Sequence, residues 1–374
     1  MKMIKSFPII LSILLLLGGC IDHTNDQVDF DNQGPMNSIR TELKIDFAQG
    51  FELIYQDQNV KIKTNSFDEN TVWRDSMAVI YNTSVENYKK AIQPSKNLRF
   101  ACQSSTHLSF LKALGAEDNL CGLCGVEYVT NPDLKEKIEE NEVVEICQGE
   151  GLMQEAILTA QPDIYLRYPF QSDFDPEDIA INSLYIAEYL EKTPLARLEW
   201  IKLFGVLIGK EAEAAQYFDD ISMEYISLKK NTENFNQTFI MNLPYQDDWY
   251  MPASNSLVVN LMGDAGLNYF YAADNGTENI LHPKEAVWSD GGKADYWIII
   301  AARPADFNLN QLIAEDPAYK TFKSVKEKKV IFCNTATVPY FTTGVLEPNV
   351  MLNDLRFATG QLMNHQPIYF QLLE

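Results

Sequence analysis

From residue 97 onward, the sequence alternates between short apolar segments and amphipathic segments of helical period. In the first half, the apolar segments are residues 97–102, 120–126, 143–147 and 163–168. Each one is separated from the next by a helical pattern. Strands that alternate with helices in this way form a mostly parallel sheet with helices on its faces. We therefore predict the α/β fold class.

The same alternation returns in the last third of the chain. Its apolar segments are residues 237–244, 294–302 and 329–334. Between the two halves, residues 210–230 keep a helical period, with Ala212, Ala215, Phe218 and Tyr225 on the expected buried face. About 21 helical residues span about 30 Å at 1.5 Å per residue. We predict two Rossmann-like lobes with mostly parallel sheets, joined by this single long helix.

The N-terminus has the pattern of a bacterial lipoprotein signal. Lys2 and Lys5 precede an apolar run, residues 7–17, which at about 11 residues is shorter than the roughly 20 needed to span a bilayer. The run ends in "LGGC", so cleavage before Cys20 and lipidation of Cys20 are expected. We predict a lipid-anchored protein of the cell envelope, on the periplasmic face of a membrane. An ordinary signal peptide and a membrane-anchored stub are the alternatives.

The composition also divides the chain into regions. Residues 21–38 are rich in Asp, Asn, Gln and Gly, which is typical of a flexible tether. Residues 39–88 contain alternating segments that indicate hairpins or a β-meander. The predicted organisation is a signal peptide (1–19), lipidated cysteine and tether (20–38), β-rich N-terminal extension (39–92), N-terminal lobe (93–192), helical segment (193–232) and C-terminal lobe (233–374).

The net charge and the absence of catalytic motifs exclude several function classes. The formal net charge is −22, whereas a nucleic-acid partner requires a basic face. The sequence contains no nucleophile elbow, no Gly-rich phosphate loop and no paired carboxylates with a nearby base. We therefore expect neither nucleic-acid binding nor enzymatic activity.

Five of the six cysteines follow Cys20, and Cys121 and Cys124 form a C-x-x-C pair. This spacing is compatible with a redox pair or with half of a zinc site. However, the pair lies in a predicted strand rather than at a helix N-terminus, where reactive dithiols are usually found. We expect small buried residues here. Whether Cys102, Cys121, Cys124, Cys147 or Cys333 form a disulfide stays open.

Polar and aromatic residues follow the predicted strands of both lobes. In an open parallel sheet, ligands bind beyond the carboxyl ends of the strands. Aromatic side chains can bury a large, partly apolar ligand, and arginines can bind its carboxylates or phosphate. Core packing is the alternative role for each aromatic residue. The candidate ligand residues are Ser105, Thr106, His107, Tyr128, Arg167 and Tyr168 in the first lobe, and Trp249, Tyr250, Arg303, Tyr340 and Phe341 in the second.

Five segments between Leu98 and Pro367 carry a family resemblance. They are "QSSTHLSFLKALGAEDNLCGL", "LMQEAILTAQPDIYLRY", "GKEAEAAQYFDDI", "PKEAVWSDGGKADYWIII" and "TGVLEPNVMLNDL". In this order, they resemble the substrate-binding lipoproteins of ABC importers for iron chelates, haem and cobalamin. The resemblance implies capture of a ligand between two lobes without chemistry. It also implies no intrinsic cofactor, although the transported ligand can contain iron or cobalt.

The resemblance further implies a partner. In this family, one glutamate on each lobe docks into arginines of the ABC permease dimer. Glu155 and Glu285 match these positions, because each lies early in a short helix that is followed by a strand. An exposed glutamate is also favoured in the first turn of any helix, which is the structural alternative.

Three rival functions are weighed against this prediction. A bare zinc or manganese site needs about four ligands, mainly histidines, but only His107 of the four histidines follows a predicted strand, so no metal site is expected. His107 is an alternative axial haem ligand, although a helix-capping or solvent-exposed role is favoured. The second rival is a thiol–disulfide protein that uses Cys121 and Cys124, and the third is a surface lipoprotein that captures ligand without a permease.

Overall fold

The computed structural model describes residues 42–374, except for residues 58, 66, 68–74, 82–89, 130, 150, 170–175 and 234–235 and the side chains of residues 128, 176 and 177. The predicted signal peptide, the lipidated Cys20 and the tether lie outside the described residues. Within the described part, no helix has both the length and the apolar character that crossing a bilayer would require.

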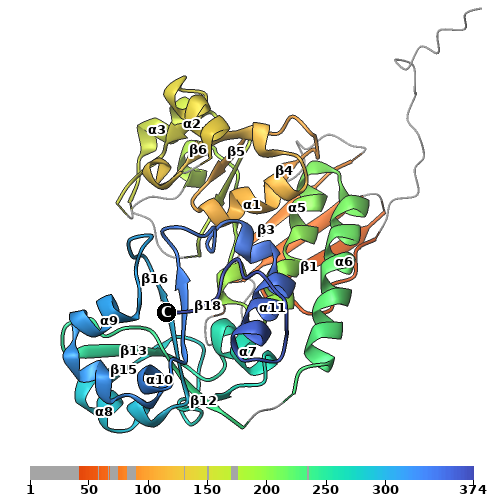
Figure 1. Cartoon of the computed structure of the whole chain (residues 1–374). Coiled ribbons are helices and arrows are strands. Elements are labelled where there is room, and N and C mark those ends of the chain that lie inside the picture. Colours follow the sequence, from red (N-terminus) through yellow and green to blue (C-terminus); the bar gives the residue numbers. More distant parts are fainter. Residues whose placement is uncertain are drawn as a thin grey trace, which may run out of the picture. The chain divides into compact units, whose positions relative to one another are not determined.

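The N-terminal lobe is built on a parallel sheet with the strand order β11-β10-β5-β6-β7. Figure 1 labels β5 and β6 of this sheet. The strands are β5 (Phe100–Cys102), β6 (Leu120–Leu123), β7 (Val144–Glu145), β10 (Ile164–Arg167) and β11 (Ser183–Tyr185). Helices α1 (Ser105–Ala113), α2 (Pro132–Glu139) and α3 (Gln154–Ala160) alternate with them, and β8 (Cys147–Gln148) pairs with β9 (Gly151–Leu152). The predicted strand–helix alternation is confirmed, and β11 is an additional strand.

The sheet of the C-terminal lobe has the order β14-β12-β16-β17-β18 and is parallel except for β18. The strands are β12 (Thr238–Met241), β14 (Asn268–Tyr269), β16 (Tyr296–Ala301), β17 (Val330–Asn334) and β18 (Gln371–Leu372). The helices are α7 (Leu257–Asp264), α8 (Lys284–Ser289), α9 (Leu309–Glu315), α10 (Lys323–Lys326) and α11 (Pro348–Ala358). A separate antiparallel ribbon pairs β13 (Asp248–Pro252) with β15 (Asn279–Pro283). The predicted fold of two Rossmann-like lobes is confirmed.

The apolar run of β16 is explained by burial on both faces of its sheet. Trp297 and Ile299 belong to one core cluster, whereas Ile298 between them belongs to another. Successive side chains of a strand point to opposite faces, so each face of this sheet is covered. A parallel strand covered on both faces reads as a continuous apolar segment.

Three helices connect the lobes: α4 (Pro194–Glu199), α5 (Ile201–Ile208) and α6 (Glu211–Lys230). The long helix α6 begins one residue later than predicted, and its buried face includes Ala214, Phe218 and Tyr225. The expectation that Ala212 lies on this face was wrong, because Ala212 is exposed. The first turn is instead oriented by Glu211, whose carboxylate accepts a 2.5 Å hydrogen bond from the hydroxyl of Tyr81.

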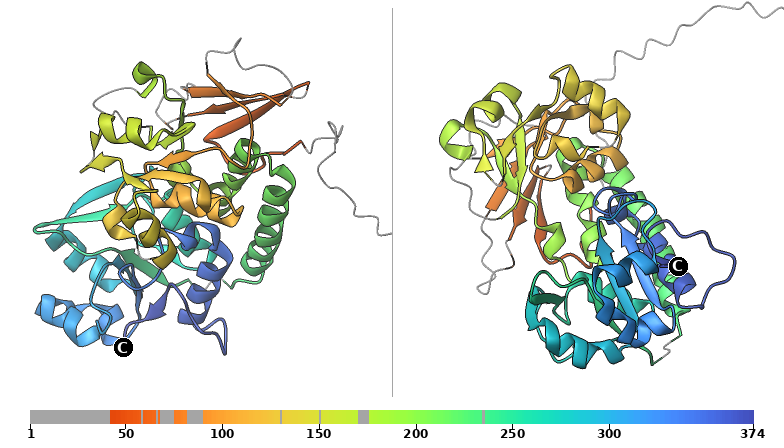
Figure 2. Two further views of the ribbon diagram at one scale, coloured as in Figure 1. Left: turned by 90° about the horizontal axis from the view of Figure 1, so that it is seen from above. Right: turned by 60° about the vertical axis from the view of Figure 1, so that its left-hand side comes forward.

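The predicted N-terminal extension forms a sheet with the order β1-β2-β3-β4. Its strands are β1 (Phe51–Gln56), β2 (Asn59–Thr64), β3 (Asp75–Val79) and β4 (Ala91–Ile92). In the views of Figure 2, this sheet lies beside the helices α5 and α6. Phe51 contacts Trp200 with ring centroids 4.9 Å apart, and both side chains belong to the core cluster that also lines the N-terminal lobe. The extension therefore shares a core with the rest of the chain.

The segment that enters this sheet is held by two buried glutamates. The carboxylate of Glu199 accepts hydrogen bonds from the backbone N–H groups of residues 46–48, at 2.7–2.9 Å. Glu191 accepts from the N–H groups of Gln49 and Gly50 and from the indole of Trp200, each at 2.9 Å. Five consecutive backbone donors therefore converge on two carboxylates of the connecting segment.

Candidate ligand-binding site

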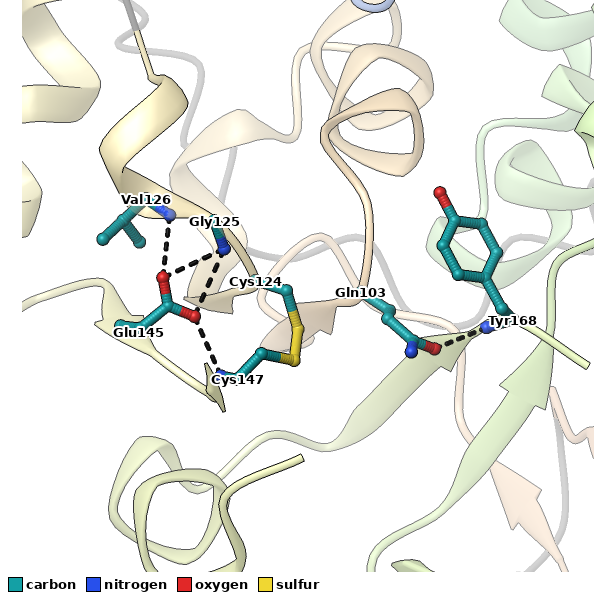
Figure 3. Close-up of a disulfide and its surroundings, with 7 residues drawn as sticks. All are labelled: Gln103, Cys124, Gly125, Val126, Glu145, Cys147 and Tyr168. Atoms are coloured by element: carbon teal, nitrogen blue, oxygen red, sulfur yellow. Dashed lines mark hydrogen bonds between the residues drawn. A yellow bond between two sulfur atoms is a disulfide. The ribbon is translucent and has the colours of Figure 1, made fainter. Parts of the chain in front are cut away.

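The strand order of the N-terminal lobe places the carboxyl ends of β10, β5 and β6 next to one another. Arg167 is the last residue of β10, and Tyr168 follows it. The side-chain oxygen of Gln103, directly after β5, accepts a 2.7 Å hydrogen bond from the backbone N–H of Tyr168 (Figure 3). The topology thus brings the predicted residues of the two strands together at one edge, as the parallel-sheet argument requires.

Helix α1 begins at this edge and carries three of the predicted residues. Ser104 caps the helix, because its hydroxyl accepts a hydrogen bond from the N–H of Thr106 and lies 2.9 Å from the hydroxyl of Thr106. Thr106 is buried, and Ser105 is half-buried. Tyr168 lies against this turn, where burial raises the pKa of its phenol and hydrogen bonds from Ser104 and Thr106 oppose that rise.

Glu188 joins this edge, although the sequence analysis did not select it. Its side chain is fully buried, and Oε1 accepts a 2.8 Å hydrogen bond from the hydroxyl of Thr106. Nη2 of Arg197 lies 3.3 Å from the same oxygen. Tyr189 packs edge-on against Tyr168, with ring centroids 5.0 Å apart. A buried carboxylate is tolerable when it is paired and hydrogen-bonded, as Glu188 is here.

A position at the end of a strand, the signal that identified Arg167, would also have identified Glu188 and Tyr189. Both residues follow a strand, β11, within four residues of its end at Tyr185. Because β11 was not predicted, the residues after it were not considered.

His107 is fully buried, which corrects the expectation that it caps the helix or faces solvent. Ser104 is the capping residue, and the imidazole packs edge-on against Tyr168 with ring centroids 5.5 Å apart. Burial lowers the pKa of His107 to about 4, although the carboxylate of Glu188, 3.9 Å from Nε2, opposes this effect. The imidazole is therefore neutral at pH 7 and forms part of the interior beneath the site.

Arg167 is also buried, and its guanidinium lies over an aromatic ring. The guanidinium carbon is 4.6 Å from the ring centroid of Tyr185, and Nη2 is 3.4 Å from the tyrosine hydroxyl. The two residues are direct neighbours in the parallel pairing of β10 and β11. Such stacking restricts the orientation of the guanidinium.

In the C-terminal lobe, the two predicted residues of β13, Trp249 and Tyr250, lie in different environments. Trp249 is fully buried, its ring N–H donates to the carbonyl of Met241 at 2.8 Å, and it packs against Trp297 and Phe322. Trp249 is therefore a core residue, and the expectation that it contacts a ligand is not supported. Tyr250 points to the opposite face of the strand and is 43 % exposed.

The other predicted residues of this lobe also differ in their environment. Arg303 makes a two-point ion pair with Glu315, with N–O distances of 2.8 and 3.2 Å, and so is oriented by a carboxylate of its own lobe. Tyr340 is buried, which raises the pKa of its phenol, and its ring packs edge-on against Phe341. Phe341 is 55 % exposed. For Tyr128, the backbone ends a 3₁₀ turn, and its side chain lies outside the described part.

Glu155 and Glu285 have the same setting in the two lobes. Each occupies the first turn of a short helix, α3 or α8, and each is exposed. Each helix leads into a parallel strand, β10 or β16. The two helices thus occupy corresponding places in the chain order, each preceding a strand of its lobe's five-stranded sheet.

The cysteines form one disulfide in the described part, and it does not join the two cysteines of the C-x-x-C pair to each other. Cys124 is bonded to Cys147 (Figure 3). Cys121 is a buried thiol whose pKa is raised to about 11 by burial. A buried, protonated thiol is a poor nucleophile. The alternative of a redox pair formed by Cys121 and Cys124 is therefore contradicted.

The described residues contain one group of three side chains with the composition of a metal site, namely Cys124, Glu145 and Cys147. Both sulfur atoms belong to the disulfide. The Glu145 carboxylate accepts hydrogen bonds from the backbone N–H groups of Gly125, Val126 and Cys147 (Figure 3). With the disulfide formed, these hydrogen bonds of Glu145 hold together the two segments that the disulfide joins.

Two α/β lobes joined by a long helix, with polar and aromatic residues at the strand ends, define a class of two-lobed binding proteins. Residues 101–337 match the periplasmic binding protein family, and the chain belongs to that family. Its members are non-enzymatic components of transport, so the prediction that the chain is not an enzyme is confirmed. The resemblance inferred from the sequence is likewise confirmed.

Individual relatives agree with this assignment. An uncharacterized lipoprotein of Methanocaldococcus jannaschii is 23% identical over 379 residues, which cover 92% of this chain and 89% of that protein. A solved periplasmic haem-binding protein of Vibrio cholerae has a TM-score of 0.56 at 14% identity, covering 70% of this chain and 98% of its own. A vitamin B12-binding protein of the same organism has a TM-score of 0.51 at 13% identity, covering 71% and 98%. These two structures share the fold of this chain.

Proposed function

We propose that the chain is the substrate-binding component of an ABC importer, anchored to the membrane by lipid on Cys20. In this proposal it captures an iron chelate, haem or cobalamin between its lobes and delivers it to a permease. Solved proteins of the same fold include ones named for haem, for ferric hydroxamate transport and for vitamin B12. The curated relative is a lipoprotein, which supports an envelope location.

The observation that carries the proposal is the set of side chains at the strand ends of the N-terminal lobe, together with two exposed aromatic residues of the C-terminal lobe. In the N-terminal lobe, the phenol of Tyr168 and the guanidinium of Arg167 stand at the carboxyl edge of the sheet. In the C-terminal lobe, Tyr250 and Phe341 are exposed aromatic residues. Exposed aromatic surface together with a fixed cation suits a large chelate that carries carboxylate or phosphate groups. We leave Trp249 out of this set.

Incubation with haemin, ferrichrome and cyanocobalamin, followed by gel filtration and absorbance spectroscopy, tests the ligand class. We expect one of these compounds to remain with the protein and to show a shifted Soret, charge-transfer or corrin band. Substitution of Tyr250 by Ala should weaken its binding about tenfold, because one buried aromatic contact contributes roughly 1–2 kcal/mol. Substitution of exposed Glu213 on α6 by Ala is the matched control. Retention of none of the compounds would contradict the proposal.

The docking role of Glu155 and Glu285 is a separate prediction. Glu155→Lys and Glu285→Lys should leave ligand binding unchanged but lower uptake at least about tenfold, because reversal of an interface charge costs several kcal/mol. The measurement is uptake of the bound compound by cells whose only copy of the gene carries the variant. Glu213→Lys, an equal charge change on an exposed helix, is the control. Normal uptake in both docking variants would favour a surface-capture lipoprotein that works without a permease.

A further inference from the structure

Asp75, the first residue of β3, connects the N-terminal sheet to the neighbouring lobe. Its Oδ1 pairs with the ammonium group of Lys90 at 2.6 Å, and each of the two side chains is only 9% exposed. Its Oδ2 accepts a 3.1 Å hydrogen bond from the backbone N–H of Tyr185, at the end of β11. A charge pair that is largely removed from water and hydrogen-bonded on both oxygens has a fixed geometry.

Tyr185 in turn contacts a candidate ligand residue. Arg167 is its direct neighbour in the parallel pairing, and the guanidinium carbon lies 4.6 Å from the centre of the tyrosine ring. The distance from Nη2 to the tyrosine hydroxyl is 3.4 Å. The ring of Tyr185 therefore sets the plane of the guanidinium, and Asp75 sets the position of the backbone that carries the ring.

We propose that the N-terminal sheet is a working part of the ligand site. Asp75, held by Lys90, positions Tyr185, and Tyr185 orients Arg167 toward an anionic group of the ligand. The inference rests on the proposed function, in which Arg167 binds a carboxylate or phosphate. A guanidinium binds such groups at two points, so its orientation decides its affinity. Asp75, Lys90 and Tyr185 are then positioning residues, and the extension contributes to specificity for anionic chelates.

The test of this proposal is a double-mutant cycle with haemin, a chelate that carries two carboxylates. Asp75→Ala and Arg167→Lys should each weaken haemin binding about tenfold, which is the value of roughly one charge-assisted hydrogen bond. The double variant should bind no more weakly than Arg167→Lys alone, because Asp75 acts through the guanidinium. Additive losses would overturn the proposal.

The matched control is Glu52→Gln, on the same sheet. It removes the 3.7 Å ion pair with Lys63 between β1 and β2. Glu52 lies on β1, which β2 separates from β3 in the sheet. Haemin binding by this variant should equal that of the unmodified chain. An equal loss in Glu52→Gln and Asp75→Ala would show that the sheet acts only through general stability, and would also overturn the proposal.

A second readout does not depend on any ligand. Phenylglyoxal labels arginine side chains according to their accessibility, and peptide mass spectrometry quantifies the label on Arg167. We expect faster labelling of Arg167 in Asp75→Ala and in Lys90→Met than in the unmodified chain, and no change in Glu52→Gln. Unchanged labelling in the first two variants would overturn the positioning role. If haemin does not bind at all, the labelling still decides that role, whereas the proposed function fails for haem.

Discussion

The carboxylates of Glu191 and Glu199 are buried. Their exposed fractions are 2 % and 0 %, and their partners include the backbone N–H groups of residues 46–50. A buried, unpaired carboxylate would cost several kcal/mol, so the donors of the incoming segment are required for the connecting segment to be stable. Lys202 adds an ion pair to Glu199 at 2.8 Å. These contacts join residues 46–50 to the connecting segment at residues 191–202, which is distant in the sequence.

The pH dependence of stability tests the role of Glu191. Burial raises its pKa to about 7, although N–H donors from Gly50, Trp200 and Gln49 act in the opposite direction. Between about pH 4.5 and 7 the folded state thus binds more protons at this group than the unfolded state does. Its contribution is fully present below about pH 4.5 and is lost as the pH rises through 7. We expect the free energy of unfolding to fall by roughly 1–3 kcal/mol over this range.

The measurement is urea unfolding between pH 5 and 8, in parallel with Glu191→Gln. The amide keeps the shape of the protonated acid and does not titrate, so this variant should lose that part of the pH dependence. Glu213→Gln, on an exposed face of α6, should retain the profile of the unmodified chain. Parallel profiles for the unmodified chain and Glu191→Gln would show that Glu191 does not titrate in this range.

At the scale of single elements, the long connecting helix was predictable, whereas strand β11 was not. The connecting helix was expected at residues 210–230 and is observed at Glu211–Lys230, because a period sustained over many residues is a strong signal. β11 has three residues, which gives no periodicity, and with it the sequence analysis missed Glu188 and Tyr189. The missed strand therefore limited how much of the site was recognised.

The ribbon β13–β15 explains the error at Trp249. No further strand was predicted directly after β12, so Trp249 and Tyr250 were both expected to follow a strand end. They lie in a strand instead, and the alternation of side chains sends Trp249 into the core and Tyr250 outward. The pairing partner, β15, begins at Asn279, about thirty residues later in the chain. Such long-range pairing leaves little trace in the local sequence.

The disulfide is a second long-range pairing that the local sequence does not reveal. Cys121 and Cys124 are close in sequence, yet Cys124 bonds to Cys147, 23 residues away, because β6 and β7 lie side by side. Sequence spacing alone does not reveal a pairing that depends on strand order. The strand ends did predict the neighbourhood of Ser105, Thr106, Arg167 and Tyr168, because parallel topology fixes which residues meet at a sheet edge.

At the scale of the molecule, the N-terminal sheet is an integral part of the described fold. Residues 41–374 form one compact unit, and the core cluster that lines the N-terminal lobe includes Phe51, Val60, Ile62 and Met77 from this sheet. Removal of four such side chains would expose apolar surface worth roughly 1.5–3 kcal/mol each. It would also leave Glu191 and Glu199 without the donors of residues 46–50. Both losses are comparable to the whole stability of a domain.

We therefore expect a chain that begins at residue 93 to lose cooperative folding, whereas one that begins at residue 41 keeps it. Circular dichroism during urea titration measures both, and the chain from residue 41 controls for removal of the signal and tether alone. The shorter chain should unfold at a much lower urea concentration or without a sharp transition, because its core is open and its buried carboxylates lack partners. Equal midpoints and slopes for the two chains would contradict this and would make the sheet an accessory to an independently stable pair of lobes.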